Sequence, residues 1–316
     1  MYLDAQIDFL LFLQNLRIST HNFFTPFFSL ITGFGEYFIP ITFCAILYWN
    51  IDKKQGTQIL LSASLTMMFC SLLKNIFCIY RPWILDTHIK PVESALRFAT
   101  GYSFPSGHSS LAVSCWGSVA LLNSHNKKIL WSMIILCLLV AFSRIYLGVH
   151  TPQDIITGLL VGTLGIFVVN KALNYIKENP QYDASVNVVI TIIGFIILTY
   201  TYFKEYPIDY NLQGEILVNS ERSRMACFPK FGFLVGALWG GYIERRFINF
   251  NFTQETIKSK VLLTILGIVI LTVISAYTAN VWKSFFNHAI SNFINMLIIS
   301  LFITCIYPFC IKKTTC

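Results

Sequence analysis

The chain has 316 residues, of which 55% are hydrophobic and only 12% are charged, and its mean hydropathy is +0.62. Because a soluble globular domain carries about 25% charged residues, this composition argues against a soluble protein and favours one that has lipid as its solvent. The formal net charge of +8 lies in short basic clusters between apolar runs. That distribution favours membrane topology and an anionic substrate over a nucleic-acid partner.

The chain is predicted to begin with a helix that lies in the membrane interface. Residues 1–25 are acidic at their start and amphipathic, and they lack the basic region and cleavage site of a signal peptide. Nine apolar runs follow, and each is interpreted as a membrane span because a helix needs about 20 residues to cross a bilayer. The runs lie near 26–49, 56–79, 106–123, 129–147, 152–176, 185–204, 229–248, 261–282 and 288–310. The fold class is therefore predicted to be all-α, a polytopic bundle of about nine transmembrane helices.

The connections between these runs alternate in charge. One set is basic and includes "NIDKKQ", "NSHNKK" and the tail "IKKTTC". The other set carries most of the acidic residues, which are Asp4, Asp8, Asp86, Glu93, Glu205, Asp209, Glu215 and Glu221. The positive-inside rule then predicts an extracytoplasmic N-terminus and a cytoplasmic C-terminus, in agreement with an odd number of spans.

Three polar stretches fall at the ends of spans on the predicted outer side: "KNIFCIYRP", "GYSFPSGHSS" and "SRIYLGVHTPQD". They contribute three cations, Lys74, Arg81 and Arg144, which would repel one another unless an anion lay among them. Phosphate fits, since arginine offers a bidentate fork and lysine a point charge. The backbone N–H groups of Ser106 and Gly107, at a helix start, are predicted to add an anion nest.

Two histidines and an aspartate complete the candidate site. His150 and Asp154 are four residues apart, so Asp154 can accept a hydrogen bond from one ring nitrogen and leave the other free as a nucleophile. His108, from another span, is a candidate general acid for the leaving oxygen. No metal is predicted, because the cations can neutralise the transferring phosphoryl group. Each stretch alone also fits a capping histidine or a snorkelling cation, and only their conjunction favours catalysis.

Two further features have no assigned role. Glu36 lies inside the first apolar run beside Gly33 and Gly35, where it can line the pocket or form a hydrogen bond across helices. The segment between the first two motifs contains Asp86, Lys90 and Arg97, which are candidates for leaving-group contacts or for solvated loop charges. The long loop between 205 and 228 is on the predicted active side and is a candidate lid.

The three stretches together resemble the signature of the type 2 phosphatidic acid phosphatase family, the membrane branch of the vanadium haloperoxidase and acid phosphatase superfamily. The signature blocks K-x6-RP, PSGH and SR-x5-H-x3-D are matched at every position over residues 74–154. The resemblance implies a phosphohistidine intermediate on His150, His108 as the acid and Asp154 as the orienting carboxylate. It implies phosphate binding by Lys74, Arg81, Ser106, Gly107 and Arg144. The long layout is similar to that of glucose-6-phosphatase and the sphingoid-phosphate phosphatases.

We therefore expect an interfacial helix at 1–25, a catalytic membrane core at 26–180, and further transmembrane helices at 181–316. The expected function is metal-independent hydrolysis of a lipid phosphate or lipid pyrophosphate at the extracytoplasmic face, without any cofactor. Two alternatives stay open at this point: a phosphatase for a soluble sugar phosphate, and a transferase that moves a phosphoryl or headgroup onto a lipid hydroxyl. The expected partners are the phosphate substrate and membrane lipids.

Overall fold

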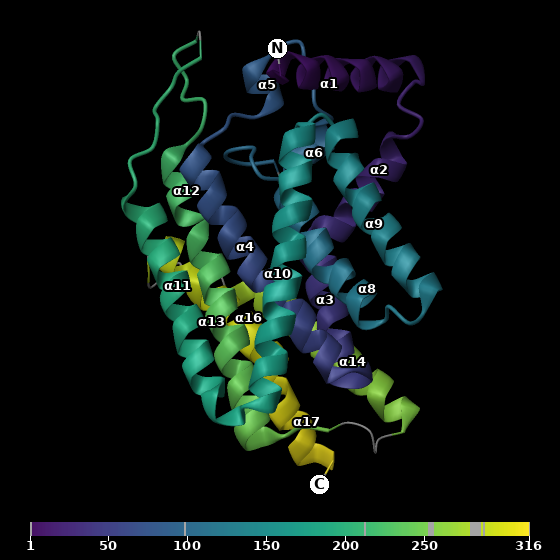
Figure 1. Cartoon of the computed structure of the whole chain (residues 1–316), viewed down its shortest axis with the longest axis vertical. Coiled ribbons are helices and arrows are strands. Elements are labelled where there is room, and N and C mark those ends of the chain that lie inside the picture. Colours follow the sequence, from purple (N-terminus) through teal and green to yellow (C-terminus); the bar gives the residue numbers. More distant parts are fainter. Residues whose placement is uncertain are drawn as a thin grey trace. The chain divides into compact units, whose positions relative to one another are not determined.

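The computed structural model describes residues 2–97, 99–211, 213–251, 256–278, 286 and 288–315. These residues form helices joined by loops, as Figure 1 shows, and the predicted all-α class is confirmed. Within these ranges the only β-type pairing is an isolated bridge between Tyr210 and Ile216. The principal α-helices are α1 (Tyr2–Ser19), α2 (Thr25–Thr32), α3 (Phe38–Ile46), α4 (Lys53–Phe77), α5 (Pro82–Leu85), α6 (Glu93–Leu96), α7 (Gly107–Ala112), α8 (Ser118–Leu122), α9 (Lys127–Tyr146), α10 (Pro152–Glu178), α11 (Asp183–Phe203), α12 (Ser220–Met225), α13 (Cys227–Ile243), α14 (Ile257–Val273), α16 (His288–Leu301) and α17 (Tyr307–Thr315).

Short helical segments of other pitch connect or extend several of these helices. Two are 3₁₀ turns, η1 (Gly33–Gly35) and η4 (Pro180–Tyr182). The others are π-helical: η2 (Leu47–Ile51), η3 (Val113–Gly117), η5 (Glu244–Ile248), η6 (Ile274–Thr278) and η7 (Phe302–Ile306). Because η3 joins α7 to α8 without a break, the second motif opens one continuous helical stretch.

Six helices in the described ranges are long and apolar enough to cross a membrane, or up to seven if the bent pair 25–35 and 38–51 forms one span. The chain is therefore a multi-pass membrane protein, but the expected count of nine is not confirmed. Two expected spans are helical without meeting the same criteria. The stretch from α7 to α8 would be only about 24 Å long, shorter than a typical hydrocarbon core of about 30 Å. The helix α13 carries Lys230 near its start. The end of the expected span 261–282 lies outside the described residues.

The chain divides into two compact units, and the first contains every motif residue. It comprises Met1–Pro40, Phe69–Gly165 and Phe203–Arg224. One of its apolar clusters joins α1 to the end of α9 and the start of α10, through Leu10, Ile145 and Ile155 among others. Arg17 of α1 fixes the same region by donating to the carbonyl oxygens of Tyr146 and Lys90, at 3.1 and 2.6 Å. The helix α1 therefore packs where α9 turns towards the third motif (Figure 1).

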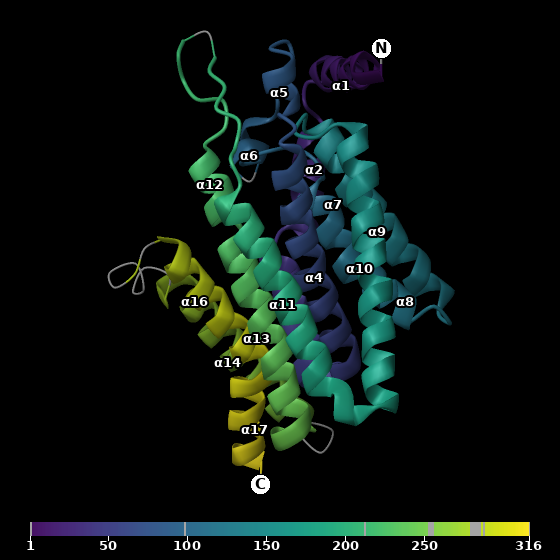
Figure 2. The ribbon, with the colours of Figure 1, turned by 60° about the vertical axis from the view of Figure 1, so that its left-hand side comes forward.

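The second unit comprises Ile41–Met68, Ile166–Tyr202 and Met225–Cys316. In it α13 and α16 lie side by side (Figure 2). Three glycines spaced four residues apart on α13, Gly232, Gly236 and Gly240, make this approach possible, because a Cβ at any of them would collide with atoms of α16 or η7. Small residues at this spacing let helices pack closely within lipid. Gly236, for example, faces the side chain of Ser300 and the carbonyl oxygen of Leu297.

Candidate active site

Local sequence signals place the ends of several elements at the site. Pro82 and Pro152 occupy first-turn positions of α5 and α10, where the missing N–H costs nothing. Ser106 is the N-cap of α7, and its hydroxyl oxygen accepts from the N–H of Ser109. The turn between α9 and α10 contains Gly148 with a φ of +77°, a left-handed conformation that glycine adopts without strain. These starts and turns bring the three motifs together in the first unit.

The third motif forms a buried histidine–carboxylate pair. The Nδ1 atom of His150 lies 3.0 Å from the Oδ2 atom of Asp154, and both side chains are 2% exposed. The same oxygen accepts from the hydroxyl of Ser103 at 2.5 Å and from the backbone N–H of Thr151 at 2.9 Å. With its negative charge held by these donors, Asp154 favours a proton on Nδ1 of His150. The Nε2 atom is then the ring nitrogen with a free lone pair.

The lone pair of Nε2 faces a cation. The Nη1 atom of Arg81 lies 2.8 Å from the Nε2 atom of His150. A guanidinium can only donate, so this contact also requires Nε2 to be the acceptor. Burial, and then the positive charges of Arg81, Lys74 and Arg144, hold the pKa of the His150 imidazole well below its usual value. His150 is therefore neutral near pH 7, which is the form that a nucleophile needs.

The two other predicted phosphate-binding cations lie in the same unit. The Nζ atom of Lys74 donates to the carbonyl oxygens of Tyr102 and Ser103, at 3.0 and 2.7 Å. Arg144 is fully buried, and its Nη1 atom donates to the hydroxyl of Thr32 at 2.6 Å. Its Nε and Nη2 atoms have no hydrogen-bond partner in the described part of the chain. A buried guanidinium with unused donors calls for an anionic ligand, because isolated buried charge is costly.

The comparisons with known proteins show which family the chain belongs to. The family model "PAP2 superfamily" matches residues 55–178, and "PAP2 superfamily phosphatase, transmembrane extension" matches residues 228–315. A lipid A 4'-phosphatase of Porphyromonas gingivalis is 30% identical over 168 residues, which are 50% of this chain and 70% of that protein. The chain belongs to the PAP2 superfamily. The family resemblance carried by the three motifs is thereby confirmed.

Two further phosphatases match part of the chain. An undecaprenyl-diphosphatase of Sulfolobus acidocaldarius is 33% identical over 126 residues, which are 40% of this chain and 58% of that protein. A probable sphingosine-1-phosphate phosphatase of Dictyostelium discoideum is 25% identical over 193 residues, which are 55% of this chain and 44% of that protein. The chain thus spans about half the length of these two relatives. No solved structure matches it.

The second PAP2 motif differs in one respect from what the sequence indicated. The backbone N–H of Ser106 donates to the carbonyl oxygen of Asp154 at 2.9 Å, so it is engaged within the protein and is not a free donor of an anion nest. This bond instead ties the start of α7 to the first turn of α10. Of the nest predicted at Ser106 and Gly107, only the N–H of Gly107 therefore stays a candidate donor to an anion.

His108, the last residue of the PSGH motif, has a ring nitrogen that makes no hydrogen bond in the described part of the chain. Its Nε2 atom is buried and has no hydrogen-bond partner in the described ranges. The carboxylate of Glu36 lies close to this nitrogen, with its Oε1 atom 4.0 Å away. A nitrogen left free in this way can exchange a proton with a substrate oxygen, which is what a general acid requires.

Two residues of the site carried no clear signal in the sequence. Ser103 lies between the first two motif blocks and contacts both members of the histidine–carboxylate pair, its hydroxyl being 3.3 Å from Nδ1 of His150. Its position three residues before Ser106 is the only hint. Thr32 reaches Arg144 from a helix 112 residues away in the chain. Such a contact depends on tertiary packing alone.

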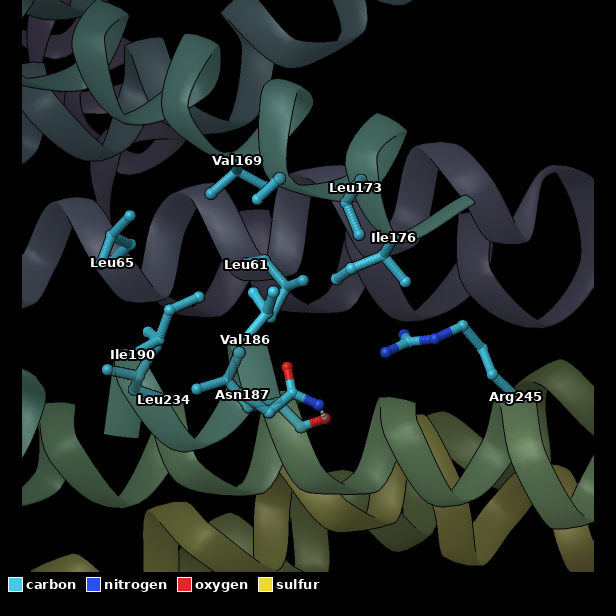
Figure 3. A pocket seen from close by; sticks show the side chains of 12 residues that line it. Leu61, Leu65, Val169, Leu173, Ile176, Val186, Asn187, Ile190, Leu234 and Arg245 are labelled. Atoms are coloured by element: carbon cyan, nitrogen blue, oxygen red, sulfur yellow. Dashed lines mark hydrogen bonds between the residues drawn. The ribbon is translucent and has the colours of Figure 1, made fainter. Parts of the chain in front are cut away.

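A pocket in the second unit is separate from this chemistry. Figure 3 shows its wall of leucine, isoleucine and valine side chains, with Asn187 and Arg245 as polar members. The guanidinium of Arg245 forms two bonds with the carboxylate of Asp183, at 2.8 and 3.0 Å. None of the three motifs lines this pocket. Within the described ranges no group of three or more His, Cys, Asp or Glu side chains could hold a metal ion, and metal independence stays a prediction.

Proposed function

We propose that this protein is an integral-membrane phosphatase that hydrolyses a lipid phosphate or lipid pyrophosphate through a phosphohistidine on His150. The proposal rests mainly on one observation. The Nδ1 atom of buried His150 lies 3.0 Å from the Oδ2 atom of Asp154, and the guanidinium of Arg81 lies at the other ring nitrogen. This arrangement orients a neutral nucleophile and places a cation where the phosphoryl group must arrive. Membership of the PAP2 superfamily and the phosphatase relatives support the same reaction class.

The reaction has two displacement steps. The Nε2 atom of His150 attacks phosphorus, and the bond from phosphorus to the leaving oxygen breaks while His108 gives that oxygen a proton. Water then attacks the phosphohistidine, giving a proton to His108 as the bond between nitrogen and phosphorus breaks. Arg81, Lys74 and the unused donors of Arg144 bind the phosphoryl oxygens, and Asp154 stabilises positive charge on the His150 ring.

For the phosphoryl group to reach Nε2, the Nη1 atom of Arg81 must give up its contact with that nitrogen. A phosphoryl oxygen is a better acceptor for a guanidinium than a neutral imidazole, because the charge-assisted bond is stronger. Substrate binding then frees the nucleophile in the same movement that anchors the phosphate. The Nε and Nη2 atoms of Arg81 can keep their bonds to the carbonyl oxygens of Gly101 and Thr100, which limit this movement to the end of the side chain.

A lipid substrate is favoured over a soluble one. The named relatives are an undecaprenyl-diphosphatase, a lipid A 4'-phosphatase and a probable sphingosine-1-phosphate phosphatase. Arg144 and Asp154 lie at the ends of helices that are apolar enough to span a membrane, so a lipid headgroup can reach the site from the bilayer. In this proposal the site and the N-terminus lie outside the cytoplasm, which the positive-inside rule supports from the charge of the connections. Residues 26–180 form the catalytic core in this proposal, and 181–316 complete the bundle.

The experiment is a phosphate-release screen with the purified full-length protein in detergent. The substrates are dioctanoyl phosphatidate, a short polyprenyl diphosphate, a sphingoid phosphate and glucose 6-phosphate, each with and without EDTA or orthovanadate. We expect release from at least one of the three lipids, resistance to EDTA and inhibition by vanadate. Release from glucose 6-phosphate alone would favour the soluble alternative, and a new phospho-product without free phosphate would favour a transferase. Loss of activity in EDTA with recovery in magnesium would contradict the metal-free mechanism.

A further inference from the structure

The first membrane-spanning region is broken beside the active site. The helical segments Thr25–Gly35 and Phe38–Ile51 are bent by 54° relative to each other. The break falls at Glu36, whose backbone is extended, with a φ of −95° and a ψ of 155°. The indole N–H of Trp116 donates to the carbonyl oxygen of Phe34 at 2.8 Å and fixes the break against η3. The break therefore has a defined position in the first unit.

Gly35 permits the break to touch His108 directly. A Cβ atom at this glycine would lie 3.0 Å from the carbonyl oxygen of His108 and 3.1 Å from its Cβ atom. It would also lie 2.7 Å from a methyl group of Val140. A larger residue would have to displace Val140 and press on the backbone of α7 at His108, so glycine is what lets the break approach α7 this closely. The next residue, Glu36, is thus presented to the side of the site that holds His108.

Glu36 brings a negative charge into a cluster of positive ones. Its Oε1 atom lies 4.0 Å from the Nε2 atom of His108, with side-chain exposures of 27% and 14%. Burial acts first on both groups; after it, the charges of Arg144, Arg81 and Lys74, together with His150, act on His108, and those of Arg144 and Arg97 act on Glu36. Every one of the cations disfavours protonation of His108. The carboxylate of Asp154 is already bound by His150, Ser103 and Thr151.

We propose that Glu36 is a positioning residue that favours the protonated form of His108 in the substrate complex and keeps its ring aimed at the leaving oxygen. This inference rests on the proposed phosphatase function and concerns a residue outside the three motifs. It also lies outside both ranges matched by the family models, 55–178 and 228–315. Glu36 counteracts the surrounding cations, and the bound phosphate adds further negative charge, so that His108 can carry its proton when the substrate is in place.

The separation of 4.0 Å suits this role. A direct hydrogen bond would engage the Nε2 proton of His108 and compete with the leaving oxygen for it. At the observed distance the carboxylate acts through space, and Nε2 has no other partner in the described ranges. In the first step the proton moves from Nε2 of His108 to the leaving oxygen as its bond to phosphorus breaks. In the second step the same nitrogen takes a proton from the attacking water, and Glu36 again faces an imidazolium.

The test compares Glu36→Gln with the wild type in full-length purified protein. Removing the negative charge leaves His108 among cations only, so it should lose its proton at a lower pH. We expect the alkaline limb of kcat for dioctanoyl phosphatidate, which reports the enzyme–substrate complex, to move to lower pH by about one unit. At a pH above this limb the loss should reach about tenfold. Glu36→Asp, which keeps the charge, should keep the alkaline limb near that of the wild type.

A second readout separates proton donation from folding. An aryl phosphate such as 4-nitrophenyl phosphate has a good leaving group that needs no proton, whereas the alkoxide leaving from phosphatidate does. Glu36→Gln should therefore lose activity on phosphatidate about tenfold more than on the aryl ester. Vanadate binding, which does not use the leaving-group acid, should be unchanged. The matched control is Glu178→Gln at the exposed end of α10, which should behave as wild type.

The outcomes distinguish this inference from the proposed function. If the wild type releases no phosphate from any substrate, the proposed function fails. If the wild type is active and the pH profile of Glu36→Gln superimposes on it, the role of Glu36 is wrong. Two other results would also overturn it. One is that Glu36→Gln loses equal activity on alkyl and aryl phosphates, and the other is that Glu36→Asp loses as much activity as Glu36→Gln at every pH. Each result indicates a structural contribution only.

Discussion

At the scale of single residues, Asp154 is the centre of the site's hydrogen bonds. Its Oδ2 atom meets the His150 ring, the Ser103 hydroxyl and the N–H of Thr151. In Asp154→Asn the amide oxygen can still accept these bonds, but the charge that stabilises a phosphorylated imidazole is lost. We expect kcat to fall by about three orders of magnitude, less than in His150→Ala, because the nucleophile remains. Steady-state kinetics with circular dichroism as a folding control measures this, and equal losses in both variants would contradict an orienting role.

The residue scale also shows what sequence patterns can reveal. The motif spacing named Lys74, Arg81, His108, Arg144 and His150, and the structure places them in one unit. Their catalytic roles stay predictions. The motif spacing did not reveal the contacts of Ser103 and Thr32, and it wrongly left the N–H of Ser106 as a free donor. A spacing rule describes only which side chains share a helix face. It does not describe which backbone groups are already bound by another element.

At the scale of elements, the approach of α10 to α7 holds the histidine–carboxylate pair beside the second motif. A Cβ at Gly158 would lie 2.8 Å from the carbonyl oxygen of Ser106 and 3.1 Å from the Cβ of Ser109. In Gly158→Val the two helices must separate, which strains the bond between Ser106 and Asp154. We expect a loss of about 1–3 kcal/mol in stability and at least about a tenfold loss of activity. Thermal unfolding in detergent and kinetics test this.

The control for this prediction is Gly33→Ala. A Cβ there would make an ordinary contact of 3.5 Å with Ile39, so both stability and activity should stay within about 0.5 kcal/mol and twofold of the wild type. If Gly158→Val behaved like this control, close packing of α10 on α7 would not be what aligns the site.

Elements were predicted well where apolar runs are long and poorly where they are broken. The runs at 129–147 and 152–176 match α9 and α10 closely, because lengths and proline signals agree. The expected single span at 26–49 is instead bent at Glu36. The polar group and two glycines at that point are consistent with a break, but hydropathy averaged over a span does not detect one. The break brings Thr32 to Arg144 and Glu36 to His108.

At the scale of the whole molecule, the open question is sidedness. Charge alone predicts that the loop near Asp86 is extracytoplasmic and the turn at Lys127 is cytoplasmic. In an otherwise cysteine-free version, Thr87→Cys should react with a membrane-impermeant thiol reagent added to intact cells. Lys127→Cys should react only after the membrane is opened. Both side chains are exposed, so accessibility within the fold does not decide the result. The reverse pattern would place the site in the cytoplasm and favour cytosolic phosphates as substrates.

The all-α class and membrane insertion follow from composition, because only helices satisfy their own backbone in lipid over such runs. The number of spans does not follow as directly. The stretch from α7 to α8 is short for a span, and charges within α13 and η5 lower its apolar character. Whether such helices cross the bilayer depends on neighbouring helices that bury their polar groups, which a sliding window along one chain cannot represent.

The central claim is a covalent phosphohistidine on His150, and trapping that intermediate tests it most directly. The purified protein is mixed rapidly with phosphatidate, quenched in alkali, in which phosphohistidine survives, then digested and analysed by mass spectrometry. We predict one phosphoryl group on the peptide that contains His150 in the wild type with phosphatidate. We predict the same in His108→Gln with 4-nitrophenyl phosphate, because that leaving group needs no proton and only the second step is then slowed. The phosphoryl group should be absent in His150→Ala. A phosphoryl group on another residue, or undiminished phosphate release by His150→Ala, would contradict the account.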